Sequence, residues 1–163
     1  MHKFLFIAAI ALFGTLGLSA CNKGHEGQAS TEAKATKPTS STDIKGWQAY
    51  LTQIVQDNLG NITNTPYVYF VPSSSSPADQ ATIGRVQDQI NTVVAATVLP
   101  GNMIAAGGPS SATTAQVLET AFKQAAPGSF KGVVVLFIGD KADEAAVKAA
   151  IEPSGATFKF AQM

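Results

Sequence analysis

Three short segments, each rich in serine, glycine or acidic residues, carry most of the side chains that could do chemistry in this sequence. Each segment follows an apolar run and precedes a predicted helix. The free amides and the dipole at a helix N-terminus can hold a phosphate or a carboxylate, and serine hydroxyls would add donors. The candidate ligand-binding residues are Ser73, Ser74, Ser75, Ser76, Gly107, Gly108, Ser110, Ser111, Gly139 and Asp140.

The segment Gly107–Ser111 is the most suggestive of an anion site, yet it departs from the known phosphate-binding loops. It is neither G-x-G-x-x-G nor a P-loop, and it has no lysine that could reach a phosphate. Pro109 also removes one amide. The pattern therefore favours a tight turn followed by a serine cap. The serine run Ser73–Ser76 is likewise more typical of a solvent-exposed loop than of a binding or nucleophilic site.

The composition gives little support to nucleophilic or metal-assisted catalysis. Both histidines, His2 and His25, precede the predicted folded domain, so that domain has no Ser-His or Cys-His pair and no histidine ligand for a metal. Asp140, Asp143 and Glu144 could bind a cation, but acidic residues in the first turn of a helix ordinarily complement its dipole. We therefore expect a non-catalytic domain without a cofactor or a metal.

Helices and strands that alternate along the chain must position the three polar segments. Apolar residues recur at helical spacing in four stretches, and short β-rich runs alternate with them. The predicted helices run from Asp43 to Gly60, from Pro77 to Val94, from Ser110 or Ser111 to Ala125, and from Asp140 to Ile151. The predicted strands are Pro66–Pro72, Asn102–Ala106, Gly132–Asp140 and Ala156–Phe160.

Strands that alternate with helices indicate a parallel sheet with right-handed crossovers. We therefore expect one three-layer α/β domain with four mostly parallel strands in the succession α-β-α-β-α-β-α-β. The third strand should be central because its apolar run Val133–Ile138 is typical of a strand covered on both faces. With the last strand at an edge, the expected strand order is 2-1-3-4. Ligands bind beyond the carboxyl ends of such strands, so this order places a crevice between the first and third polar segments.

Four aromatic side chains cluster in the first helix and the first strand. Tyr67 and Tyr69 share one face of the strand, and Trp47 and Tyr50 lie on the helix. The tyrosines are expected to pack under a helix with their hydroxyls at a rim. The alternative is that an exposed tryptophan or tyrosine anchors a protein interface.

The first 21 residues differ in kind from the rest of the chain. A short positive head, residues 1–3, precedes the uncharged apolar run Phe4–Leu18. About 15 apolar residues are fewer than the roughly 20 that a membrane-spanning helix needs, and they fit the apolar region of a secretory signal. The tetrapeptide LSAC follows at residues 18–21, and Cys21 is the only cysteine of the chain. This arrangement resembles the lipobox of bacterial lipoproteins.

The resemblance implies a lipid anchor. In that family the signal is cut before the cysteine, which carries a diacylglyceryl thioether and usually an acylated amine. Residues 1–20 would then be the signal peptide, and Cys21 would hold the mature chain in a lipid bilayer. Each buried CH₂ contributes roughly 0.8 kcal/mol, so two or three acyl chains would anchor the protein permanently. The next residue is Asn22 rather than the Asp that favours inner-membrane retention, so the resemblance favours the periplasmic face of the outer membrane.

The remaining chain divides into a tether and a domain. Residues 21–42 are expected to comprise the acylated cysteine and a disordered tether, and residues 43–163 the α/β domain. Residues 22–42 contain no Val, Ile, Leu, Met, Phe, Trp or Tyr, so they cannot bury enough apolar surface to offset their ordering entropy. In the whole chain 11 Lys and Arg balance 11 Asp and Glu without clustering, so the basic patch that nucleic-acid binding needs is missing.

The anchor, the tether and the missing catalytic residue types favour one function class. We expect a non-catalytic envelope lipoprotein, a protein-binding or accessory module that faces the periplasm and has an envelope protein as its partner. The alternative is a lipoprotein that binds a small ligand or an anion in the crevice. A carboxylate hydrolase in which Asp79 and Asp140 converge is a third hypothesis.

Overall fold

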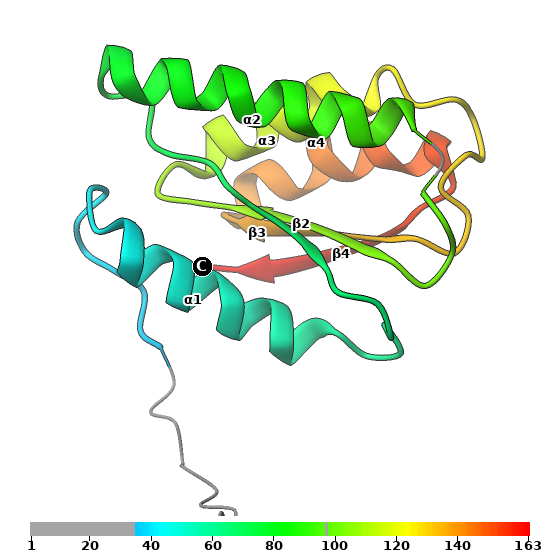
Figure 1. Cartoon of the computed structure of the whole chain (residues 1–163), viewed down its shortest axis with the longest axis horizontal. Coiled ribbons are helices and arrows are strands. Elements are labelled where there is room, and N and C mark those ends of the chain that lie inside the picture. The colour runs from blue at the N-terminus through cyan, green and yellow to red at the C-terminus, as the bar shows by residue number, and fades with distance from the viewer. Residues whose placement is uncertain (1–34, 97) are drawn as a thin grey trace, which may run out of the picture. The chain divides into compact units, whose positions relative to one another are not determined.

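The computed structural model describes residues 35–96 and 98–163, in which helices and strands alternate (Figure 1). The helices are α1 (Ile44–Asn58), α2 (Pro77–Ala95), α3 (Ser111–Phe122) and α4 (Lys141–Ile151), followed by the short 3-10 helix Glu152–Ser154. The strands are β1 (Tyr67–Phe70), β2 (Met103–Gly107), β3 (Val134–Gly139) and β4 (Thr157–Gln162). The predicted single α/β domain and its succession of elements are confirmed.

The strand order differs from the prediction. All four strands are parallel and lie in the order β1-β2-β3-β4, so the predicted order 2-1-3-4 is wrong. β3 lies inside the sheet and β4 at an edge, as expected, but β1 takes the other edge. All five residues of β2 are buried, whereas Tyr67 and Val68 of β1 are 45% and 44% exposed. The alanines of β2 have low β propensity, but their small side chains suit an inside position covered on both faces.

The sequential order decides where the helices lie. Here each connection moves one strand further in the same direction across the sheet. Because such crossovers are right-handed, all three connecting helices lie on one face of the sheet. Accordingly α2, α3 and α4 cover one face together, and α1 lies alone on the other (Figure 1). The three layers are therefore unequal, with three helices above the sheet and one below it.

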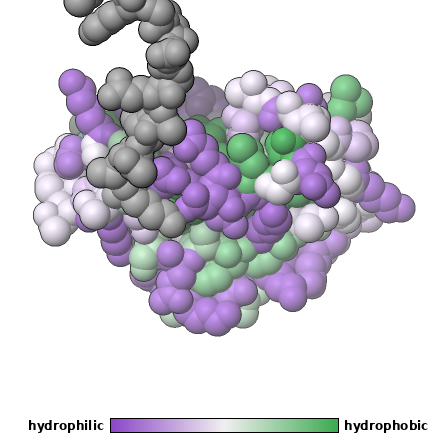
Figure 2. All heavy atoms as spheres, turned by 90° about the horizontal axis from the view of Figure 1, so that it is seen from below, coloured by the Kyte–Doolittle hydropathy of each residue, from purple (hydrophilic) through white to green (hydrophobic). Residues whose placement is uncertain are grey.

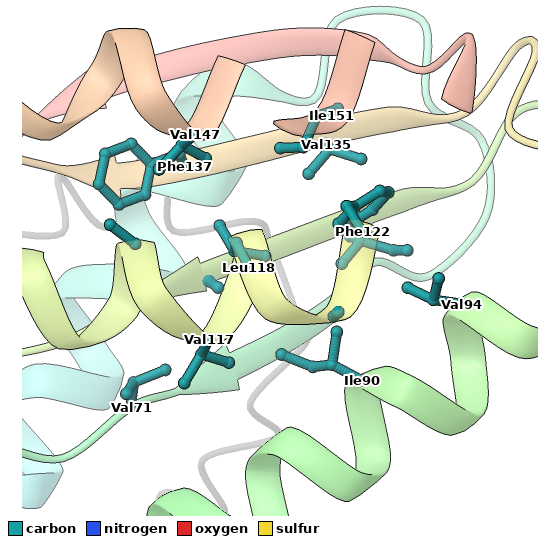
Figure 3. Packing of buried hydrophobic residues seen from close by; sticks show 14 of the residues in the cluster. Val71, Ile90, Val94, Val117, Leu118, Phe122, Val135, Phe137, Val147 and Ile151 are labelled. Atoms are coloured by element: carbon teal, nitrogen blue, oxygen red, sulfur yellow. The ribbon is translucent and has the colours of Figure 1, made fainter. Parts of the chain in front are cut away.

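The larger apolar core lies between the sheet and the three helices. α3 packs between α2 and α4, and its Leu118 lies in the same core cluster as Ile90 of α2 and Ile151 of α4 (Figure 3). Beneath them lie Val135 and Phe137 of β3, both fully buried. The unbroken apolar run of β3 thus has its alternate residues in this core.

The smaller core lies under α1. Leu51 and Val55 of α1 pack against the other face of the middle strands, where Leu136 and Ile138 are fully buried. β3 is therefore covered on both faces, as its sequence predicts.

The folded domain begins ahead of the boundary predicted at Asp43. Trp47 is 2% exposed, and its Nε1–H donates to the carbonyl of Ser40 at 3.0 Å. Asp43 caps α1 by accepting a hydrogen bond from the Gly46 amide at 3.0 Å. The described end of the predicted tether thus contributes at least Ser40 to the domain.

The predicted signal peptide, Cys21 and tether residues 22–34 lie outside the described residues. Within the part of the chain that the structure describes, no helix has the length and apolarity needed to cross a membrane.

Candidate functional site

The three polar segments meet at the carboxyl edge of the sheet, because all four strands are parallel and each segment leads into a helix. The prediction of a crevice between the first and third segments is wrong, because these two segments are not neighbours. β2 and its following segment lie between β1 and β3, and the strand order never reverses. A ligand crevice in such sheets forms where the order reverses, so this sheet lacks that switch point.

The serine run before α2 forms hydrogen bonds within its own loop. The hydroxyls of Ser73 and Ser75 lie 2.8 Å apart, and Ser75 donates to Oδ2 of Asp79 at 3.1 Å. Ser76 caps α2 by accepting from the Asp79 amide at 3.1 Å, while Ser74 is exposed. This loop therefore behaves as a capped helix start, the interpretation that the sequence favoured.

Gly107, the last residue of β2, and Gly108, which follows it, allow close packing. A Cβ on Gly107 would lie 2.6 Å from Cδ2 of Leu51, and a Cβ on Gly108 would lie 1.8 Å from the carbonyl oxygen of Val71. Ser110 then caps α3 by accepting from the Thr113 amide at 3.2 Å, and it also bonds the Thr113 hydroxyl at 2.8 Å. The absence of side chains at these glycines serves the packing of β2 against its neighbours.

Ser111 links the second and third segments. Its hydroxyl is buried, accepts from the Asp140 amide at 2.7 Å and donates to the carboxylate of Asp143. Gly139 makes room for this contact, because a Cβ there would lie 2.7 Å from the Ser111 oxygen. Ser111 therefore ties the start of α3 to the first turn of α4. The sequence singled out Ser111 as an anion donor and did not foresee its pairing with Asp143, which is distant in sequence.

Three of the four acidic residues at this edge have side-chain partners. Asp79 pairs with Ser75, Asp143 with Ser111, and Glu144 forms an ion pair with Lys141. Asp140 occupies the N-cap position of α4 without a side-chain cap. Among the described residues there is no group of three or more His, Cys, Asp or Glu side chains that could hold a metal ion. A cation held by Asp79, Asp143 or Glu144 would have to displace bonds that these side chains already form.

A second candidate site lies at the open edge of β1. Tyr67 and Val68 are 45% and 44% exposed, and Leu99 is 67% exposed. Leu99 lines the same hollow as Tyr67, so three of the large exposed apolar side chains gather at one edge. Large apolar side chains that gather on a surface are typical of an interaction site.

Two open hollows flank this edge strand, one on each face of the sheet. The hollow on the α2 side measures about 380 Å³ and is lined by Asn64, Tyr67, Val93, Ala96, Val98, Leu99 and Asn102. The hollow on the α1 side measures about 340 Å³ and is lined by Gln48, Leu51, Thr52, Val68 and Phe70. Seen from the α1 side, apolar patches lie among hydrophilic surface (Figure 2). We call the β1 strand and its two hollows the β1 edge.

The aromatic residues have separate roles. Trp47 is buried in contact with Tyr50, at 5.9 Å between ring centroids, so it is not an interface anchor. Tyr69 packs against the larger core, and burial, followed by the neighbouring Tyr67 hydroxyl, raises its pKa above the ordinary value. Tyr67 is the aromatic residue left exposed.

A comparison with protein-family models, curated proteins and solved structures finds no match to this chain. The geometry of the two candidate sites is therefore the basis for assigning a function.

Gly108→Ala tests whether the glycine segment is a packing element. The new methyl group would overlap the Val71 carbonyl, so we expect a loss of about 1–3 kcal/mol in the free energy of unfolding. Gly84→Ala is the matched control, because a Cβ there meets nothing within 4 Å, and helix propensity predicts a gain of about 0.5–1 kcal/mol. Urea unfolding of both variants measures the difference. Equal effects of the two alanines would contradict the packing role.

Ser111→Ala tests whether the buried hydroxyl is a structural link. It removes the acceptor for the Asp140 amide and the donor to Asp143, so we expect a loss of about 1.5–3 kcal/mol. The exposed Ser74→Ala is expected to change stability by less than about 0.5 kcal/mol. Urea unfolding with and without inorganic phosphate measures both. A loss that appears only when phosphate is present would favour an anion site instead.

Proposed function

We propose that this chain is a lipid-anchored bacterial envelope lipoprotein whose α/β domain binds another protein through the β1 edge. The observation that carries the proposal is that exposed Tyr67 and Leu99 line one open hollow and exposed Val68 lines the other. Tyrosine is enriched among the anchors of protein interfaces, and exposed apolar side chains that gather on a surface mark interaction sites. The domain would act by binding, without catalysis of its own.

The anchor half of the proposal is supported by the lipobox resemblance at residues 18–21. Acylation of Cys21 would fix the chain to a bilayer, and Asn22 favours the periplasmic face of the outer membrane. Binding of an anion at the carboxyl edge has weaker support, because the serine hydroxyls there already bond Asp79, Thr113 and Asp140.

Cys21→Ala tests the anchor. Without the thiol no thioether can form, so we expect no incorporation of labelled palmitate and an accumulation of the uncut precursor in bacterial membranes. Asn22→Ser keeps the cysteine and is expected to be labelled and cut normally. Metabolic labelling followed by gel electrophoresis measures both. A Cys21→Ala chain that is processed normally and released from the membrane would contradict the lipoprotein assignment.

Site-directed photocrosslinking tests the partner. A photoreactive amino acid at Tyr67 of the anchored chain is expected to give a discrete adduct with another envelope protein, because Tyr67 lies exposed at the β1 edge. The same group at Ala145, exposed on α4, is expected to give none. Mass spectrometry of the adducts identifies the partner. Equal adducts from both positions, or adducts between copies of this chain alone, would contradict the proposal.

A further inference from the structure

We infer that the partner contributes an extended peptide segment, with uncharged side chains at two adjacent central residues, that pairs with β1 as a further strand of the sheet. This inference rests on the proposed function and adds the mode of recognition and the chemistry of the partner. Strand addition takes its affinity from main-chain hydrogen bonds and its specificity from pockets that receive side chains on either face.

The backbone of β1 offers free hydrogen-bonding groups at its open side. The Val71 amide donates to the carbonyl of Gly107 at 2.9 Å, so Val71 faces β2. Successive residues of a strand face opposite sides, and the N–H and C=O of one residue point to the same side. Tyr69 and Tyr67 therefore also face β2, whereas Val68 and Phe70 direct their N–H and C=O groups outward. In Figure 1 the blue-green β1 crosses in front of β2, at the edge of the sheet.

The two edge strands of the sheet differ in charge. β4 carries Lys159, whose Nζ donates to the carbonyl of Asn58, and a charge on an edge strand is a common protection against pairing. β1 has no charged residue. Pro66 and Pro72 bound it instead, and since proline has no N–H, pairing is limited to the short stretch between them. The β1 edge is therefore open to a short segment and closed to a long one.

The two hollows would receive side chains from that segment. In an added strand, neighbouring residues point to opposite faces, so one side chain would enter the α1-side hollow and the next the α2-side hollow. The α1-side hollow presents Leu51, Val68 and Phe70, which suits an aliphatic side chain. The α2-side hollow adds the amides of Asn64 and Asn102 to an apolar wall, which suits a side chain with an apolar body and a polar tip.

The lack of charge in both hollows restricts which side chains the partner segment can place there. None of the residues that line either hollow is charged. A charged side chain buried there would lose its hydration without gaining an opposite charge, which is costly. The segment is therefore uncharged at the two residues that enter the hollows.

Other occupants fit less well. A second copy of this chain, paired through β1 about a two-fold axis, would leave the hollows empty. Its Tyr67 and Val68 already line the hollows of their own domain, and its Tyr69 and Phe70 pack against the cores of that domain. The chain's own residues 22–42 contain no large apolar side chain that could fill them. A segment of another protein, with its side chains free, can fill both hollows.

The test uses the mature, lipid-anchored chain in nanodiscs and a defined probe. The probe is a capped seven-residue peptide with leucine and tyrosine at adjacent central positions and threonine elsewhere. We expect it to slow hydrogen exchange at the Val68 and Phe70 amides at least about fivefold. A control peptide N-methylated at both central residues loses whichever amide faces β1, and it is expected to give no protection.

A pair of protein variants checks the same contact from the other side. Val68→Pro removes an outward N–H without touching the β1–β2 ladder, since proline is tolerated on the open side of an edge strand. We expect it to weaken peptide binding about tenfold or more, whereas Val68→Thr keeps the amide and is expected to stay within about threefold of the wild type. If Val68→Pro fails to fold, the N-methylated peptide decides the question.

Each remaining outcome has a defined meaning. Unchanged exchange at Val68 and Phe70, or equal binding of the N-methylated peptide, would overturn strand addition. Protection that grows with protein concentration in the absence of peptide would show self-pairing and overturn it as well. If Tyr67 still crosslinks to a partner in these cases, the proposed function stands and only the mode of binding fails. If Tyr67 gives no adduct either, both fail.

Discussion

A right-handed crossover fixes on which face of a parallel sheet its helix lies, and in this domain that constraint acts three times in the same direction. α2, α3 and α4 therefore share one face, and α1 alone must cover the other. A helix about 10 Å wide covers about two strands that lie about 4.8 Å apart. α1 packs on the middle strands through Leu51 and Val55 and also contacts β1, yet this single helix leaves Val68 at the edge partly uncovered. The α1-side hollow is thus a consequence of the strand order.

At the carboxyl edge of the sheet, in contrast to the uncovered β1 edge, many of the polar groups form hydrogen bonds with one another. Ser76 and Ser110 cap their helices, and Ser111 joins α3 to α4 through Asp140 and Asp143. Within the described residues, no buried side-chain nitrogen or oxygen lacks a hydrogen-bond partner. Burial of an unpaired polar group is costly, so a segment that satisfies itself gains stability and loses donors for a ligand. The serine and aspartate residues that suggested an anion site therefore use their polar groups to stabilise the helix starts.

The sequence was sufficient for the elements and insufficient for their arrangement. Helical periodicity, the cap at Ser76 and the apolar run of β3 are local signals, and they predicted the succession of helices and strands. Strand order depends on which strands lie inside the sheet and which lie at its edges. The alanines of β2 carry little information about whether that strand lies inside. The pairing of Ser111 with Asp143 and the β1 edge follow from the order, so neither could be predicted. The sequence does show that β1 lacks the charge that Lys159 gives to β4, but this indicates an open edge only once β1 is known to be an edge strand.

An uncharged open edge is ordinarily a hazard, because it invites pairing with any exposed strand. Two features of this chain restrict that hazard. Pro66 and Pro72 allow only a few main-chain hydrogen bonds, each worth about 0.5–1.5 kcal/mol, so chance pairing is weak. Under the proposed anchoring at Cys21, a partner in the same envelope would meet the domain at an effective concentration far above that in free solution. A weak edge is then enough for a tethered partner and too weak for a free one, so the anchor and the short strand would together set the specificity.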